Sequence, residues 1–112
     1  MQCYIETNEF GDKFYYMNNV LHREGGPAVE YVNGEKQWYK NGQRHREGGP
    51  ACEHIDGYKA WYKNGKRHRE DGPAIEYANG DKDWILNNKF YGMDDDFTNE
   101  TWKKFSKTII FC

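Results

Sequence analysis

The sequence has no long apolar run. No segment approaches the roughly 18 apolar residues that span a membrane. The first ten residues, MQCYIETNEF, have neither the basic region nor the apolar run of a secretory leader. The net charge of −2 is too small to require a nucleic acid or a membrane surface as partner. We therefore expect a cytoplasmic protein with neither a leader nor a membrane span.

Cysteine is scarce as well. Cys3, Cys52 and Cys112 are odd in number and widely separated, and no two of them have the C-x-x-C spacing of a zinc or redox site. Small secreted domains hold paired cysteines in disulfides, and neither this number nor this scatter fits such a framework. We expect three reduced thiols.

Apolar residues are few, but those present are large. They make up 37% of the 112 residues, and aromatic residues alone account for 17%. Many are Tyr or Trp, which carry a polar atom and suit a sheet whose side chains lie half in water. The length is that of one domain with a modest core.

One seven-residue word occurs three times. HREGGPA begins at His22 and at His45, and HREDGPA begins at His68, so the period is 23 residues. A fixed period of this kind is typical of a stacked array, whose end units diverge because they face water. The same period runs through columns of Gly, Lys, aromatic residues and Asn: Gly11, Gly34, Gly57 and Gly80; Lys13, Lys36, Lys59 and Lys82; Tyr15, Trp38, Trp61 and Trp84; Asn18, Asn41, Asn64 and Asn87.

Each unit contains two turn signals, such as Asn33-Gly34 and Asn41-Gly42. Asn-Gly is favoured in two-residue type I′ hairpin turns, because both positions need a positive φ. We therefore predict a mainly β fold. It is an antiparallel meander of stacked 23-residue β-hairpin repeats over residues 1–92, one hairpin per repeat. A capping C-terminal α-helix within residues 93–112 closes it.

Two-residue turns determine which side chains share a face. The first turn would place Val29 opposite Trp38, and the second would place Trp38 opposite His45 and Tyr39 opposite Arg44. We expect the face with Trp38 and His45 to be packed and the other to be available to a partner. The predicted partner-binding residues on the available face are Tyr39, Tyr62, Arg44, Arg46, Arg67 and Arg69.

The pattern becomes helical after residue 92. Trp102, Phe105 and Ile109 recur at helical spacing. Thr98 can cap the first turn, and Phe97 can pack against Trp102 as a hydrophobic staple. We expect this helix to cover the open end or one face of the last hairpin.

The three repeated histidines, His22, His45 and His68, look like a set of metal ligands in the sequence, but we do not expect them to meet in space. Equivalent residues of adjacent hairpins lie two strands apart, about 9.5–10 Å, whereas a zinc ion holds each nitrogen at about 2 Å. We expect each imidazole to pack on a Trp and bond to backbone, with no metal and no cofactor.

Acid–base chemistry finds no better support. Glu24, Glu47 and Glu70 each follow an Arg, which predicts Arg–Glu pairs between repeats. No nucleophile or phosphate-binding motif occurs. Every polar residue that could act is present in triplicate, whereas an active site is asymmetric. We therefore expect no enzymatic activity.

The segment WYKNGKRHREDGPAIEYANGD, Trp61 to Asp81, resembles the MORN repeat. It is more similar to the HREDGPA-type variant of that repeat, found in proteins of bacteriophages, giant viruses and some bacteria. The similarity covers residues 8–92 and departs from MORN proper where Arg46 and Arg69 replace the Gly after His. The resemblance implies strings of β-hairpins that bind or tether partners without catalysis. The phage-like variant implies a small inhibitor of a host defence protein, acting in the host cytoplasm.

Three kinds of partner fit the residues. A protein is the main expectation, because interface cores are rich in Tyr, Trp and Arg. Single-stranded nucleic acid is an alternative, since residues 22–69 carry ten Lys and Arg against six acids and mix them with aromatics. An anionic membrane, bound through the same Arg and Lys columns, is a weaker alternative. Uncovered sheet edges also predict self-association.

Overall fold

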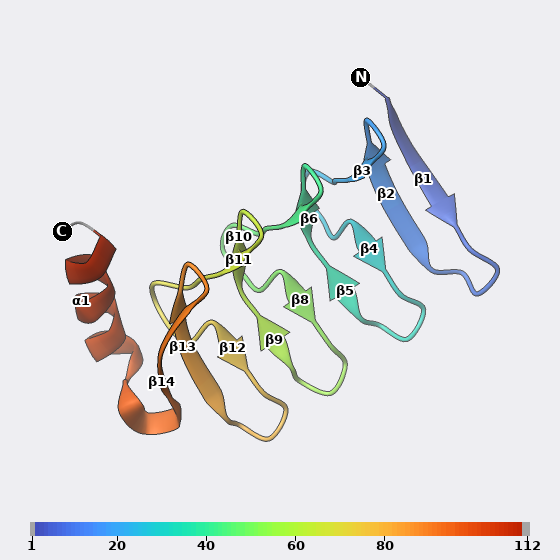
Figure 1. The fold of residues 1–112 in the computed structure, drawn as a ribbon. Coiled ribbons are helices and arrows are strands. Elements are labelled where there is room, and N and C mark those ends of the chain that lie inside the picture. The colour runs from blue at the N-terminus through green and yellow to red at the C-terminus, as the bar shows by residue number, and fades with distance from the viewer. Residues whose placement is uncertain (1, 111–112) are drawn as a thin grey trace.

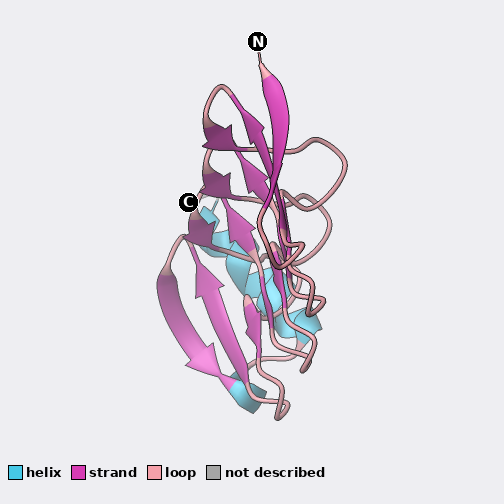
Figure 2. Cartoon of the chain, turned by 90° about the vertical axis from the view of Figure 1, so that its right-hand side faces the viewer, coloured by secondary structure: helices cyan, strands magenta, loops and turns pink. Residues whose placement is uncertain are grey.

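A computed structural model describes residues 2–110 of the chain. The fold is mainly β with antiparallel strands and one C-terminal helix, as predicted, and Figure 1 shows the hairpins in a row between the N-terminus and that helix. Seen from the N-terminal end in Figure 2, successive hairpins overlie one another. Cys3 and Cys52 are free thiols, as expected. Cys112 lies outside the described residues.

Ten strands form the main sheet, whose order follows the chain. The path is β1 (Cys3–Thr7), β2 (Lys13–Met17), β4 (Val29–Glu30), β5 (Lys36–Gln37), β8 (Cys52–Glu53), β9 (Lys59–Ala60), β12 (Ile75–Glu76), β13 (Lys82–Leu86) and β14 (Lys89–Met93), with β3 (Val20–Leu21) paired to β2. Sequence neighbours are therefore sheet neighbours, which confirms the meander.

Each complete repeat contributes a second hairpin, where we expected one. These hairpins are β6 (Tyr39–Lys40) with β7 (Gln43–Arg44), and β10 (Tyr62–Lys63) with β11 (Lys66–Arg67), each a separate two-stranded sheet. The chain passes between the two sheets at Trp38. Its N–H donates to Ala51 in the next repeat at 2.7 Å, while its carbonyl accepts from His45 at 3.1 Å. The N–H of Trp38 thus bonds within the main sheet and its carbonyl bonds within the second hairpin, so the strand is divided at this residue.

The second turn of the repeat has the predicted geometry. Tyr39 lies opposite Arg44, and the two residues between the strands, Asn41 and Gly42, have φ values of 53° and 81°. Two successive positive φ values are the mark of the type I′ turn. This part of the predicted register is confirmed.

The first turn of the repeat differs from the prediction. Val29 lies opposite Gln37, not Trp38. The Tyr31 N–H donates to Glu35 O at 2.9 Å, so the loop between them has three residues instead of two. The register therefore shifts by one residue, which moves a side chain to the other face. Val29 consequently lies on the face opposite Trp38.

The C-terminal segment forms a short 3₁₀ helix, η1 (Asp94–Asp96), and then α1 (Asn99–Ile110). The predicted cap and staple are both confirmed. The Thr101 N–H donates to Thr98 Oγ1 at 3.1 Å, and the rings of Phe97 and Trp102 lie 4.8 Å apart. Ile109, the last residue of the expected apolar stripe, is 43% exposed.

Helix α1 packs where a further HREGGPA loop would otherwise stack. Trp102 Nε1 donates to the Arg69 carbonyl at 2.7 Å, and its ring lies 5.5 Å from that of buried Trp84. Position 92, one period after Arg69, is Gly. A Cβ atom there would lie 3.2 Å from the Phe97 ring. The helix thus covers the last hairpin, as predicted.

Most of the buried apolar residues form two clusters. One lies along the central repeats and consists of Cys52, Ala60, Ala74, Ile75 and Ile85, with Tyr58 and Tyr62 packed on it. The other lies under the helix and consists of Trp84, Leu86 and Trp102, with Tyr91, Phe97 and Phe105 around them. The small residues of the first cluster leave room for large aromatic side chains on top.

Candidate partner-binding surface

The histidine of the repeated word joins adjacent repeats. His45 Nδ1 accepts from the backbone N–H of Asn64 at 3.0 Å, and its Nε2 bonds Glu47 at 3.0 Å. Because Nδ1 is the acceptor, the ring proton resides on Nε2. The same bonds join His22 to Asn41 and Glu24, and His68 to Asn87 and Glu70. The predicted bond from imidazole to backbone is confirmed.

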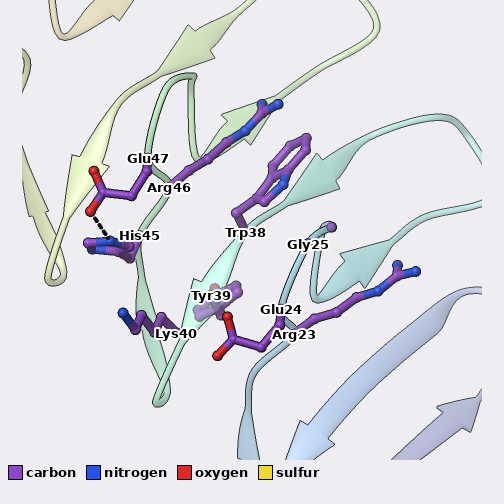
Figure 3. A pocket seen from close by; sticks show the side chains of 10 residues that line it. Arg23, Glu24, Gly25, Trp38, Tyr39, Lys40, His45, Arg46 and Glu47 are labelled. Atoms are coloured by element: carbon purple, nitrogen blue, oxygen red, sulfur yellow. Dashed lines mark hydrogen bonds and ion pairs between the residues drawn. The ribbon is translucent and has the colours of Figure 1, made fainter.

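The arginine of the word bonds to groups close to it in the sequence. The Arg46 guanidinium lies 3.8 Å from the Trp38 ring centroid, and its Nη1 donates to Glu53 and to the Pro50 carbonyl, both at 3.0 Å. Figure 3 shows Arg46 extended beside Trp38 while Glu47 turns back to His45. Arg23 and Arg69 repeat this arrangement with Tyr15 and Glu30, and with Trp61 and Glu76.

These contacts overturn two predictions. Glu24, Glu47 and Glu70, the Glu that follows each Arg, bond the histidines, so their expected pairing with Arg is wrong; each Arg pairs instead with the Glu seven residues later. Arg46 and Arg69 were also expected beside Tyr39 and Tyr62. They lie instead over the Trp residues, because a long side chain can fold back on the neighbouring strand. Their role as partner-binding residues stays a prediction.

The face with Trp38 is less packed than expected. Trp38 and Trp61 are half-buried beneath their arginines, whereas Trp84, which α1 covers, is 1% exposed. Among the described residues, no group of three His, Cys, Asp or Glu side chains is arranged to hold a metal ion. The Trp side of the array is thus occupied by internal stacks.

The other four predicted residues come together on the opposite face. The Arg44 guanidinium lies 5.9 Å from the Tyr39 ring centroid and 5.4 Å from that of Tyr62. The Arg67 guanidinium lies 5.9 Å from the Tyr62 ring centroid as well. We call these four residues, with the aromatic side chains described below, the Tyr/Arg face. Arg44, Arg67 and Tyr62 line an open cavity of about 430 Å³ with Glu35, Gln37, Cys52, His54, Asp56 and Tyr58.

The two arginines of this face lack the ion pairs that the other three have. Within residues 2–110, no carboxylate pairs with Arg44 or Arg67, whereas Arg23 and Arg46 each pair with one carboxylate and Arg69 pairs with two. Arg44 Nε is in addition buried without a hydrogen-bond acceptor. A buried donor without an acceptor is costly and is a mark of a site that a ligand or water completes.

An aromatic row extends the face beyond the predicted residues. It consists of two groups of rings in contact: Phe14 with Tyr31 at 6.1 Å, and Tyr58 with His54 at 4.9 Å and with Tyr77 at 5.8 Å. Sequence reasoning missed Tyr31 and Tyr77 because the assumed two-residue turn placed their side chains on the same face as the Trp residues. Tyr58 shares the alternation of Tyr62 and could have been found from that spacing.

Near neutral pH the phenols of Tyr31, Tyr58 and Tyr77 and the thiol of Cys52 are uncharged. Burial raises the pKa of Tyr31 and Tyr58, and a hydrogen bond to Asp83 raises the pKa of Tyr77 to about 12. Burial also raises the pKa of the Cys52 thiol beneath them. The face therefore combines neutral aromatic rings with two guanidinium cations that have no acid partner among the described residues.

The fold and this face define a short array of β-hairpin repeats with one helical cap. No family model, no curated protein and no solved structure matches the chain. No helix within residues 2–110 is long and apolar enough to cross a membrane.

Proposed function

We propose that this chain is a non-enzymatic binding module that recognises a protein partner through the Tyr/Arg face. The single observation that carries the proposal is the pair Arg44 and Arg67, cations without carboxylate partners inside an aromatic row, one with a buried unsatisfied Nε. Tyr and Arg are the residues enriched where protein interfaces bind most strongly. Tyr also supplies rigid contact area at a low entropic cost.

A carboxylate on the partner fits this face. The guanidinium groups of Arg44 and Arg67 lie 5.4 and 5.9 Å from the Tyr62 ring centroid. A planar guanidinium matches the two oxygens of a carboxylate. Glu35 and Asp56 line the same cavity as Arg44 and Arg67, so the cavity has little net positive charge to hold a chain of phosphates, whereas one carboxylate needs only a single guanidinium group. A single Asp or Glu side chain within an apolar or aromatic patch is therefore the partner group that we propose.

The nucleic-acid alternative loses two of its cations. Arg46 and Arg69, which would have extended the basic column, are paired with Glu53 and Glu76. No contact in the structure favours phosphate, so nucleic acid and membrane are kept as outcomes of the test. The resemblance to phage HREDGPA-type repeats supports a host defence protein as the partner and MORN-like tethering as the mode of action.

The test is capture of the partner by variants of the two faces. Tyr62→Ala combined with Arg67→Ala should weaken binding at least tenfold, about 1.4 kcal/mol. Lys59→Ala is the matched control, because Lys59 is exposed and its side chain points to the face opposite that of its β9 neighbour Ala60. Affinity is measured by calorimetry after circular dichroism has shown that the variants are folded. Equal binding by the double variant would refute the proposal. So would tight binding to oligonucleotide that is independent of base sequence and falls steeply with salt, or co-sedimentation with liposomes that needs anionic lipid.

A further inference from the structure

We propose that the free edge of β1 pairs with the same edge of a second copy, giving a closed two-fold dimer. This inference goes beyond the proposed function and does not depend on it, because it uses the end of the array and not the Tyr/Arg face. It assigns the self-association predicted from the sequence to one edge and one register.

The β1 strand has hydrogen-bonding groups on its open side. Among the strands of residues 2–110 it pairs only with β2, and all five of its residues are exposed. The Gln2 carbonyl accepts from Asn18, and the Asn8 N–H donates to Asp12, so even-numbered residues bond towards β2. In an antiparallel ladder the alternate residues point away. Cys3, Ile5 and Thr7 therefore present N–H and C=O groups to solvent.

Devices that usually protect an edge strand are missing from β1. Lys, Pro, bulges and short length prevent edge pairing in natural sheets. The segment CYIET has no Lys or Pro, its register with β2 is unbroken over five residue pairs, and the inner strands of the repeats have only two residues each. Its length and regularity make β1 a template for another strand.

The apolar surface beside this edge is also open. Ile5 is 57% exposed and lies on a cavity of about 480 Å³ whose lining is mainly apolar and includes Cys3, Tyr15 and Met17. Pairing of two β1 strands would bring two such surfaces together at one seam. Burial of apolar area then adds to the backbone hydrogen bonds.

A two-fold register centred on Ile5 suits the side chains. In antiparallel pairing, Ile5 lies opposite Ile5 of the second copy, Tyr4 lies opposite Glu6, and Cys3 lies opposite Thr7. Glu6 is the only charged residue of β1, and this register gives it a tyrosine neighbour instead of a second carboxylate. No like charges face each other across the seam.

The other end of the array explains why assembly stops at two. Helix α1 lies against β14 there, through the ring contacts of Tyr91 with Trp102 at 5.9 Å and with Phe105 at 5.3 Å (Figure 1). An array with one open end and one capped end can use its open edge once. An interface that joins a surface to its own copy closes on itself.

The experiment is the molar mass of the full chain by light scattering over a wide concentration range. The wild type should reach the mass of two chains, and Ile5→Lys, which places a charge at the centre of the seam, should remain a single chain. Phe90→Lys is the matched control, because Phe90 is 51% exposed at the capped end, and it should dimerise like the wild type. Thermal unfolding verifies that both variants fold.

A cross-linking arm tests the register. With Cys3 and Cys112 replaced by Ser, the Ile5→Cys variant should form a disulfide-linked dimer under mild oxidation, whereas Thr7→Cys in that background should not. A wild type that stays monomeric throughout, or an equal loss of dimer in Ile5→Lys and Phe90→Lys, would overturn the proposal. Tyr62→Ala with Arg67→Ala should leave the mass unchanged, which separates a failure here from a failure of the proposed function.

Discussion

At the scale of single residues, the side chains of the repeated HREGGPA word hold adjacent parts of the array together. Its His accepts a backbone N–H of the next repeat, and its Arg stacks on an aromatic ring and pairs with the Glu seven residues later. Because these residues form the same bonds in every copy, stacking of the repeats is enough to explain why they recur, and no ligand has to be assumed. Arg44 and Arg67, in contrast, lie beside tyrosine rings but have no carboxylate partner in the described chain.

One residue, Tyr77, gives a prediction about pH. Its hydroxyl donates to Asp83 at 2.6 Å, which raises the pKa of Tyr77 to about 12. An unfolded tyrosine has a pKa of about 10. The folded protein therefore holds this proton more tightly, and the resulting stability is present below pH 10 and is lost as pH rises towards 12.

We expect Tyr77→Phe to be less stable than the wild type near neutral pH, because the hydrogen bond to Asp83 is lost. The difference should shrink as the wild-type phenol ionises in alkali. Urea unfolding at a series of pH values measures it. A difference that stays constant up to high pH would contradict the assigned hydrogen bond.

At the scale of elements, the two turns of a repeat use Asn-Gly in different ways. The β10–β11 turn needs positive φ at both positions, 52° at Asn64 and 83° at Gly65. The β4–β5 loop has three residues between its bonded ends, and its Gly34 has a φ of 101°. The same dipeptide thus supports two loop lengths.

Asn64→Val should lower the free energy of unfolding by about 1–2 kcal/mol, because a β-branched residue is strained in the left-handed region. Asn64→Gly, which keeps the conformation accessible, is the matched control and should cost much less. Chemical denaturation compares the two. If both substitutions had the same effect, backbone strain would not be the cause.

At the scale of the whole molecule, the array has unlike ends. Each repeat bonds to its neighbours through backbone and histidine hydrogen bonds. The stability of each repeat therefore depends on the repeats next to it. The C-terminal end is closed by α1, and the N-terminal end exposes β1. This asymmetry is what makes a limited assembly the expected outcome.

Trp102→Ala should destabilise the capped end by about 3–5 kcal/mol, because Trp102 is 0% exposed and fills the second core cluster. Hydrogen exchange should show protection lost first in β12–β14 and retained longest in β1–β5. Ile109→Ala, at an exposed position of the same helix, is the control and should change little. Uniform loss along the chain would instead indicate that the array unfolds as one unit.

Local chemistry in the chain was sufficient for much of this architecture. The 23-residue period, the meander, the type I′ turn at Asn41-Gly42 and the capped helix after Thr98 all depend on residues close together in sequence. Turn preference and helix capping act over a few residues, so they can be recognised without knowing what surrounds them. The pairing of Tyr39 with Arg44 follows directly from such a turn.

The loop between β4 and β5 and the path of Arg46 depended on contacts between strands. Asn33-Gly34 is compatible with two loop lengths, and the bond from Tyr31 to Glu35 selects the longer one, which transfers Tyr31 to the Tyr/Arg face. A flexible arginine can reach either side of a strand, and the Trp38 ring with Glu53 holds it on one. Folding settles both, because the choices differ in energy only once neighbouring strands are in place.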